Sequence, residues 1–167
     1  MKVKRFRIIS FIVLLSWMLL IFLLSNETAA ESSFTSGGFS RLLFRILYPH
    51  FKDMTSIEQS ELLEAASFII RKLAHFTIYL VLGIFASLTV ISYRKFDILN
   101  RAAAAWLICV FYSISDEIHQ TFIDGRSGEL RDVLIDSSGA FISVLIIFIL
   151  ATKIKRIYSL VRKIDLE

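Results

Sequence analysis

Four long apolar runs, separated by polar segments, dominate the pattern of this chain. The first covers residues 8–24 without a charge, and the others begin near Leu73, Ala102 and Val133. A helix needs about 20 residues to cross the hydrocarbon core of a bilayer. The third run is long enough only if its helix continues through DEIHQTF to Phe122. We therefore predict four membrane-spanning helices, at about residues 6–25, 72–91, 102–122 and 133–151.

The first apolar run has an alternative interpretation as a cleaved signal peptide. Thr28-Ala29-Ala30 loosely fits a small-x-small cleavage site. The run is 17 residues long, whereas the apolar region of a signal peptide has about 7–15. Its length therefore favours an uncleaved span.

The segment between the first two predicted spans, residues 26–71, has patterning of its own. Residues 25–38 are rich in Ser, Thr, Glu and Gly, which predicts a loop. Apolar residues then recur at helical spacing up to Pro49: Phe39, Leu42, Leu43, Ile46 and Leu47. We predict a short amphipathic helix here, which either lies in the membrane interface or packs on the other helices.

A second helix start follows in the same segment. Thr55-x-x-Glu58 and Ser56-x-x-Gln59 both have the capping-box pattern. Nothing breaks the helical pattern between them and Leu73. We expect one helix to run from this point into the second span.

The composition supports a membrane protein. Of the 167 residues, 56% are apolar and 20% are charged, against roughly 45–50% and 25% in soluble domains. This composition excludes a disordered chain and a disulfide-rich mini-protein, and the single Cys109 can close no internal disulfide. The prediction is one all-α domain over residues 1–167, a bundle of four transmembrane helices with a helical extracytoplasmic segment.

The distribution of basic residues predicts the orientation. Twelve of the 19 Lys and Arg residues lie at the two termini or between the second and third spans, and seven lie in the other two loops. Since cytoplasmic loops carry more Lys and Arg, both termini should be cytoplasmic, in a bacterial plasma membrane. All three histidines, His50, His75 and His119, then lie on the outer side. The positive charge is thus a topology signal, and we expect no nucleic-acid partner.

Polar residues gather at the outer ends of the last three predicted spans. They are Arg71, Lys72, His75 and Tyr79 on the second; Asp116, Glu117, His119 and Gln120 on the third; and Asp132, Asp136 and Gly139 on the fourth, with Gly125 and Arg126 in the loop before it. Ionisable groups within spans rarely face lipid, so these should face inward and pair. Ion pairing that only holds the bundle together is one interpretation. So many polar groups at one depth favours a functional site.

The blocks RKLAHFTIYLVLG (71–83), SDEIHQTFIDGRSGELRDV (115–133) and DSSGA (136–140) resemble the VanZ-like family of bacterial membrane proteins. The serine-rich LLSNETAAESSFTS segment (23–36) is similar to the stretch after that family's first span. The resemblance implies an integral membrane protein of the cell envelope, in a family named after a protein linked to teicoplanin resistance, and supplies no reaction. The family's polar motif positions map onto Lys72, His75, Tyr79, Asp116, Glu117, His119, Gln120, Gly125, Arg126, Asp132 and Gly139. Many members have Asn where this chain has Asp136.

Two functions remain open from the residues. The first is binding of an anionic envelope ligand, such as a lipid headgroup, a lipid-linked sugar or a glycopeptide, because Arg grips phosphate in a bidentate manner. The candidate binding residues are Arg71, Lys72, Tyr79, Gln120, Arg126, Asp132 and Asp136.

The second is a membrane-embedded hydrolase or transferase acting on a lipid-linked substrate. His75, Asp116, Glu117 and His119 would then be an acid–base set or the ligands of a divalent metal, the one cofactor that the sequence suggests. H-E-x-x-H and G-x-S-x-G are both absent from the chain, which excludes zincin and hydrolase-elbow sites. A channel ranks below both functions, because no polar path crosses the apolar inner halves of the spans.

Overall fold

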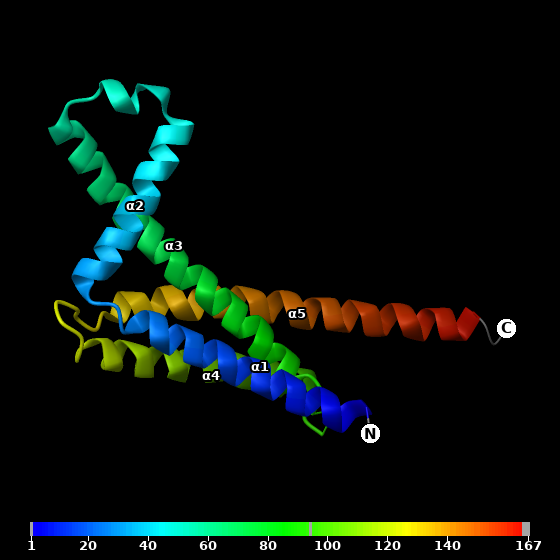
Figure 1. Cartoon of the computed structure of the whole chain (residues 1–167). Helices are drawn as coiled ribbons and strands as arrows, with labels where there is room; N and C mark the ends of the chain where they lie inside the picture. Colours follow the sequence, from blue (N-terminus) through cyan, green and yellow to red (C-terminus); the bar gives the residue numbers. More distant parts are fainter. Residues whose placement is uncertain (1, 94, 165–167) are drawn as a thin grey trace.

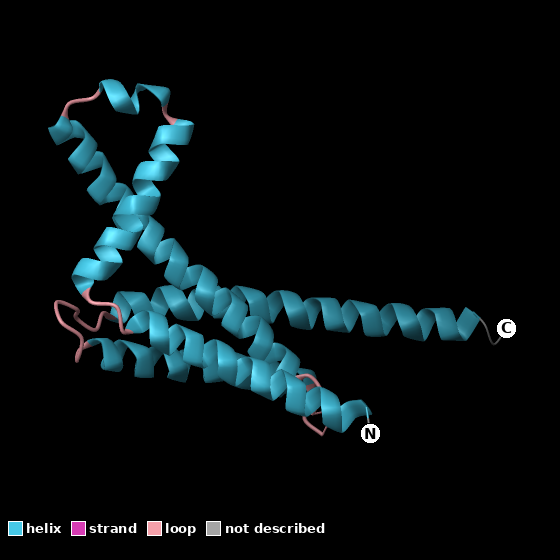
Figure 2. Cartoon of the chain, in the orientation of Figure 1, coloured by secondary structure: helices cyan, strands magenta, loops and turns pink. Residues whose placement is uncertain are grey.

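The computed structural model describes residues 2–93 and 95–164, and side chains within residues 3–93 and 95–154. Among the twelve basic residues predicted to be cytoplasmic, six have side chains outside these ranges: Lys2, Arg94, Lys155, Arg156, Arg162 and Lys163. The described residues form helices joined by short loops and contain no strand (Figure 2). The helices are α1 (Lys2–Ser25), α2 (Ala29–Leu47), η1 (Pro49–Asp53), α3 (Ser56–Val90), α4 (Ile98–Gln120) and α5 (Leu130–Ile164).

Four of these helices, α1, α3, α4 and α5, are long and apolar enough to cross a membrane. This confirms the all-α, four-span prediction. α4 ends at Gln120, two residues before the predicted end, and α5 begins at Leu130, three residues before the predicted start. Leu14 and Ile21 of α1 are buried in the core that α3, α4 and α5 share, so the first apolar run is part of the bundle.

The helix α3 begins as predicted and runs unbroken for 35 residues. Thr55 is its N-cap, and the reciprocal capping box with Glu58 is formed. The second capping pattern is not used, because the Gln59 amide donates instead to the carbonyls of Phe51 and Met54.

The prediction of a loop over residues 25–38 is wrong for most of that range, because α2 begins at Ala29. Thr28 caps it in a capping box with Glu31, and the hydrogen bonds from Thr28 hold the pKa of the Glu31 carboxyl below its ordinary value. Inside the helix, the Ser36 and Ser40 hydroxyls donate to carbonyls four residues earlier. Such bonds let serine remain helical, and composition alone does not reveal them.

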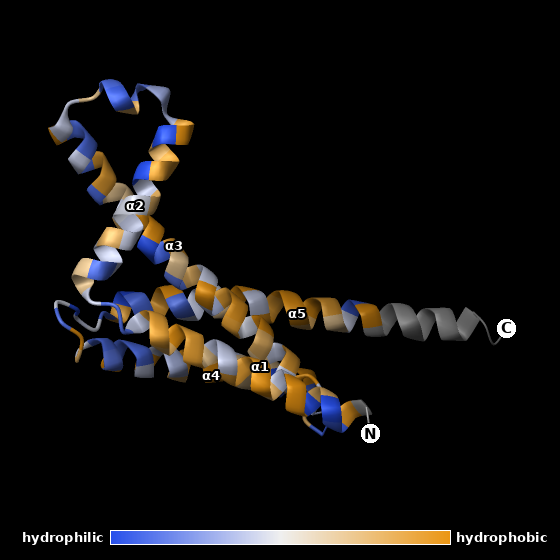
Figure 3. Ribbon diagram, viewed as in Figure 1, coloured by the Kyte–Doolittle hydropathy of each residue, from blue (hydrophilic) through white to orange (hydrophobic). Residues whose placement is uncertain are grey.

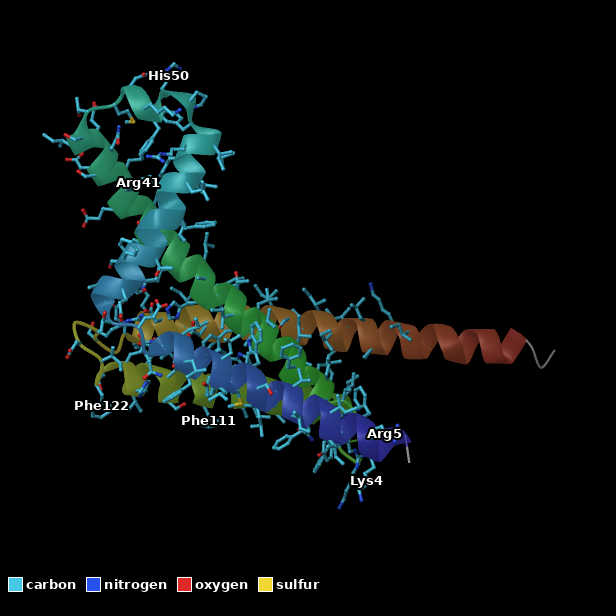
Figure 4. The ribbon with its side chains drawn as sticks, viewed as in Figure 1. Lys4, Arg5, Arg41, His50, Phe111 and Phe122 are labelled. Carbon is cyan, nitrogen blue, oxygen red and sulfur yellow. The ribbon has the colours of Figure 1, made fainter. Side chains whose placement is uncertain are left out.

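The small residues of α2 also explain where it lies. Ser40 is fully buried, and its hydroxyl is 3.2 Å from that of Ser67 on α3. Gly37 lies close to the same Ser67 side chain. Short side chains thus let α2 cross α3 at close range, and the two helices form a hairpin that projects from the bundle (Figure 1). Arg41 and His50 lie on this hairpin, far from the bundle (Figure 4).

The amphipathic part of α2 ends before Pro49 as predicted. Its apolar side chains are exposed, with Leu42, Ile46 and Leu47 all more than half accessible. Packing against the other described helices therefore leaves much of this face exposed, and its place in the membrane interface stays a prediction.

The bundle core is tightest where α3 crosses α5. A Cβ added to Gly83 would lie 2.7 Å from the Ala140 carbonyl oxygen, and one added to Gly139 would meet the Phe76 carbonyl oxygen. Only glycine permits this approach. The contact between α3 and α1 is less close. It includes a hydrogen bond from the Trp17 indole N–H to the Ile78 carbonyl at 3.0 Å.

The polar residues of the bundle gather at one end. Figure 3 shows apolar residues along most of α1 and α4 and polar residues at the end of α4 and the start of α5. Phe122 marks this end, and Lys4 and Arg5 mark the opposite one (Figure 4). The start of α1 and the end of α5 point toward the same side of the molecule (Figure 1).

Candidate functional site

Three helices and a loop contribute to the polar end. The middle of α3 passes through it, α4 ends in it and α5 begins in it, with residues 121–129 connecting the last two. At Gly125 the loop has a φ of +72°, a conformation that side chains disfavour. The Arg126 N–H then bonds the Ile123 carbonyl at 3.0 Å, and this turn directs Arg126 back over the bundle.

The first charged group at this end, the ion-pair group, comprises Lys72, Glu129, Arg131 and Asp132. The Lys72 ammonium lies 2.5 and 2.7 Å from the two carboxylate oxygens of Asp132 and 3.6 Å from Glu129. Arg131 pairs with Glu129 at 2.8 Å. Every charge in this group therefore has a partner.

The second, the His–carboxylate group, comprises His75, Glu117 and Asp136. One ligating atom from each lies within 4.8 Å of the others. His75 Nδ1 is 3.5 Å from Asp136 Oδ1, and the Ser113 hydroxyl donates to Asp136 Oδ2 at 2.9 Å. The Glu129 N–H donates to Glu117 Oε2 at 2.8 Å. The other oxygens, Asp136 Oδ1 and Glu117 Oε1, are buried without a hydrogen-bond partner among the described residues.

A cavity of about 410 Å³ lies beside these groups, between α1, α2 and α3. Its polar wall includes Arg71, His75, Tyr79, Asp116 and Arg126, and its apolar wall includes Ile21, Leu24, Phe39, Ile70 and Ile78. Arg71, His75 and Tyr79 share one face of α3, as their spacing predicts. The cavity is thus amphiphilic, with two arginines on its polar wall opposite an apolar wall.

The two arginines of the cavity are held differently. Arg126 donates from Nε to the Glu27 carbonyl at 3.1 Å and from Nη1 to Gln120 Oε1 at 3.0 Å. Gln120 in turn donates to Asp116 at 3.3 Å. Arg71 is half-buried and forms no hydrogen bond or ion pair within the part of the chain that the structure describes. Its charge is available to a ligand.

Two residues on the cavity wall, Tyr79 and Asp116, each have one fully buried side-chain oxygen. The Tyr79 hydroxyl and Asp116 Oδ1 bond to no described residue, although buried polar groups are nearly always hydrogen-bonded. One hydroxyl and one carboxylate oxygen of the cavity wall therefore lack a hydrogen-bond partner among the described residues.

The structure brings together only some of the predicted site residues. His75 and Glu117 meet, and Asp136 joins them, whereas Asp116 lines the cavity. His119 lies outside the His–carboxylate group, because its ring packs on Phe22 of α1 with centroids 4.6 Å apart and its Nε2 is 3.2 Å from Asn26 Oδ1. Helical spacing had grouped His119 with Asp116 and Gln120, but α1 covers that edge of α4.

The predicted ligand-binding residues divide in the same way. Arg71, Tyr79 and Arg126 line the cavity, and Gln120 supports Arg126. Lys72 and Asp132 pair with each other outside the cavity, and Asp136 belongs to the His–carboxylate group.

Sequence reasoning missed two kinds of site residue. Ser113, which holds Asp136, lies one helical turn before Glu117 on α4, and this spacing could have indicated it. Ser25, Ser32 and Ser36 also line the cavity, but the serine-rich segment had been predicted as a loop.

The fold and site define a class: a helical membrane protein with four apolar helices long enough to span and a buried polar cluster at one end. The chain belongs to the VanZ/LLP1 family, whose model matches residues 10–151. The match includes every residue of the polar cluster. No curated protein and no solved structure matches the chain.

Proposed function

We propose that this VanZ-family protein binds an anionic lipid headgroup in the cavity between α1, α2 and α3. The observation that carries the proposal is Arg71, a half-buried cation on the cavity wall without a partner among the described residues. A cation that is partly removed from water favours an anion beside it. Phosphate suits the planar guanidinium, which can donate two parallel hydrogen bonds.

The other polar groups indicate a headgroup that carries hydroxyls. Tyr79 offers an unused O–H donor, and Asp116 offers an unused acceptor oxygen. A bare phosphate would satisfy Arg71 and Tyr79 but would repel Asp116. A phosphate with a neighbouring hydroxyl, as in a glycerol or sugar headgroup, complements all three residues.

The apolar wall suits the acyl chain of the same molecule. Ile21 and Leu24 of α1, Phe39 of α2, and Ile70 and Ile78 of α3 line it. A lipid in this position would bury its acyl chain against the apolar wall and keep its headgroup beside the two arginines. A lipid-linked sugar fits the same description, and a glycopeptide such as teicoplanin would compete for the polar part.

The proposed setting is the outer face of a bacterial plasma membrane, with both termini cytoplasmic. The excess of Lys and Arg at the termini and in the loop between α3 and α4 supports this orientation. Reporter fusions at Phe96 and the C-terminus should then report cytoplasm, and fusions at Ser56 and Ser127 the outside. A C-terminal fusion that reports outside would contradict the orientation and remove the cavity from the outer leaflet.

Lipid retention tests the proposal. The full-length protein would be purified in mild detergent, exchanged into mixed lipid, and analysed by native mass spectrometry with phosphatidylglycerol, phosphatidic acid and phosphatidylethanolamine. We expect retention in that order, and Arg71→Gln should reduce phosphatidylglycerol retention about tenfold, because a hydrogen bond to a charged group contributes about 1.5–3 kcal/mol.

Arg131→Gln is the matched control, because Arg131 is exposed and pairs with Glu129 outside the cavity. Equal losses in the two variants, or equal retention of the anionic and zwitterionic lipids, would contradict the proposal. Addition of teicoplanin or of a lipid-linked sugar to the same sample would show whether either displaces the phospholipid.

A second candidate function is a membrane-embedded enzyme acting on a lipid-linked substrate. The supporting observation is that a titratable pair, His75 and Asp116, lines the cavity in which the headgroup would lie. Such groups could move a proton to or from a ligand hydroxyl or phosphate ester. Incubation with radiolabelled phosphatidylglycerol or lipid-linked sugar, followed by chromatography, should show turnover that His75→Gln abolishes if the protein is an enzyme, and no turnover if it only binds.

A further inference from the structure

We propose that His75, Glu117 and Asp136 form a binding site for one divalent cation at the edge of the lipid cavity, which shares only His75 with it. The three residues come from α3, α4 and α5 and have ligating atoms within 4.8 Å of one another. One imidazole and two carboxylates supply three protein ligands, which is the number that zinc sites with an open position use.

Two buried oxygens without a hydrogen bond point to a cation in this group, although Asp136 Oδ1 also lies 3.5 Å from His75 Nδ1. Asp136 is 0% and Glu117 is 5% exposed, and each has one side-chain oxygen without a hydrogen-bond partner in the described chain. Leaving such an acceptor buried and unsatisfied costs about 1–3 kcal/mol. A cation bound by both oxygens would remove that cost.

The remaining oxygens of both carboxylates are held in place. Ser113 donates to Asp136 Oδ2 at 2.9 Å, and the Glu129 N–H donates to Glu117 Oε2 at 2.8 Å. This is the outer support that metal-binding carboxylates typically have, with one oxygen fixed and the other presented to the ion.

The charge balance also favours a cation. Lys72, the nearest lysine on α3, is engaged by Asp132 at 2.5 Å and by Glu129 at 3.6 Å. Among the residues that the structure describes, His75 is then the one basic side chain paired with either buried carboxylate, at 3.5 Å from Asp136. Buried carboxylates require compensation, and one divalent cation would supply it.

The backbone holds the ligands at a fixed separation. Gly139 lies one helical turn after Asp136 on α5. It packs against the carbonyl of Phe76, and Phe76 directly follows His75 on α3. The crossing of α3 and α5 is thereby fixed beside the ligands. A mixed nitrogen and oxygen ligand set suits Zn²⁺ or Mn²⁺ better than Ca²⁺ or Mg²⁺, which prefer oxygen alone.

Metal titration tests this inference independently of lipid binding. The full-length protein would be stripped with chelator, titrated with Zn²⁺ and with Mn²⁺ in detergent, and analysed for bound metal after gel filtration. We expect one ion per chain. Asp136→Asn and Glu117→Gln should each weaken affinity at least tenfold.

His119→Ala is the matched control, because His119 lies at the same end of the bundle but faces Asn26, and it should retain full metal. A gel-filtration profile and thermal unfolding of each variant would show that it is folded. X-ray absorption of the zinc-loaded wild-type protein needs no variant and should show one imidazole nitrogen among oxygen ligands.

Three results would overturn the inference: no stoichiometric metal in the wild-type protein, unchanged affinity in folded Asp136→Asn, or an equal loss in His119→Ala. Metal binding with no lipid retention would leave the site intact and reject only the lipid proposal. Lipid retention without metal binding would reject the metal site and leave the lipid proposal standing.

Discussion

Two charged groups lie about one helical turn apart on the α3–α5 interface and differ in how completely they are paired. In the ion-pair group, Lys72 is held by both oxygens of Asp132. In the His–carboxylate group, His75 approaches Asp136 at 3.5 Å, and two carboxylate oxygens have no hydrogen-bond partner among the described residues. The sequence presents the groups alike, as a basic residue on α3 opposite an aspartate on α5.

The difference separates a structural role from a chemical one. A group in which every charge is paired is sufficient to hold helices together and offers nothing to a ligand. A group with unsatisfied buried oxygens is costly unless something binds it. The comparison therefore supports helix assembly as the role of Lys72 and Asp132, and it supports the proposed ligand chemistry for His75, Glu117 and Asp136 with the adjoining cavity.

Breaking the ion-pair group should have the largest effect on stability. Asp132→Ala leaves the part-buried Lys72 without its closest partner, and we expect a loss of about 3 kcal/mol in the free energy of unfolding, because removing one partner of a buried pair strands the other charge. Denaturant unfolding in detergent would measure it. The double variant Lys72→Met, Asp132→Leu should recover much of the loss, and a double variant as unstable as Asp132→Ala would contradict the structural assignment.

The glycine contact that positions both groups should come next. Gly139→Ala places a Cβ against the Phe76 carbonyl oxygen, and the helices must move apart at a cost of about 1–3 kcal/mol. Gly38→Ala on α2 is the control, because nothing lies within 4 Å of a Cβ there. Thermal unfolding that ranks Gly38→Ala as the more damaging change would mean that α3 and α5 do not cross so closely.

Energetic coupling sharpens the comparison further. In a double-mutant cycle in metal-free protein, His75→Ala and Glu117→Ala should couple by about 1–2 kcal/mol, as expected for contacting groups. The parallel cycle of His119→Ala with Glu117→Ala should couple less, because residues two apart on a helix do not face each other. If the His119 cycle gave the larger coupling, the arrangement of α4 against α1 and α3 would be wrong.

The smallest effect on stability is expected at Arg126. Arg126→Lys keeps the charge but loses the planar donor geometry that reaches Glu27 and Gln120. We expect normal membrane accumulation, a change of about 1 kcal/mol in unfolding and several-fold weaker retention of phosphatidylglycerol. Full retention in the Lys variant would show that geometry at this position is unimportant.

Much of the fold follows from the sequence. Apolar run length indicates four spans, and Thr55 with Glu58 marks the start of α3 where the structure has it. The region before Phe39 was missed because serine favours loops on average. Here Ser36 and Ser40 bond to their own helix and fit against Ser67, a tertiary effect that local composition does not encode.

The candidate site was predictable only in part. Helical spacing correctly placed Arg71, His75 and Tyr79 on one face, because that follows from the helix repeat alone. It could not show which edge of α4 meets α1, so His119 was placed in one site with His75 and Glu117. Nor could helical spacing show that Lys72 pairs with Asp132 and His75 with Asp136. Those pairings depend on the register between α3 and α5, which the close contacts at Gly83 and Gly139 set.

The most direct test of the lipid proposal is photo-crosslinking with a phosphatidylglycerol that carries a diazirine on its headgroup, followed by peptide mapping. The cavity between α1, α2 and α3 predicts labels near Ser36, Arg71 and Arg126. A second cavity of about 510 Å³, lined by apolar residues such as Trp106 and Phe148 on α4 and α5, provides an internal comparison. The account predicts headgroup labels at the first cavity and their loss in Arg71→Gln. Labels concentrated at the second cavity, or unchanged in Arg71→Gln, would contradict it.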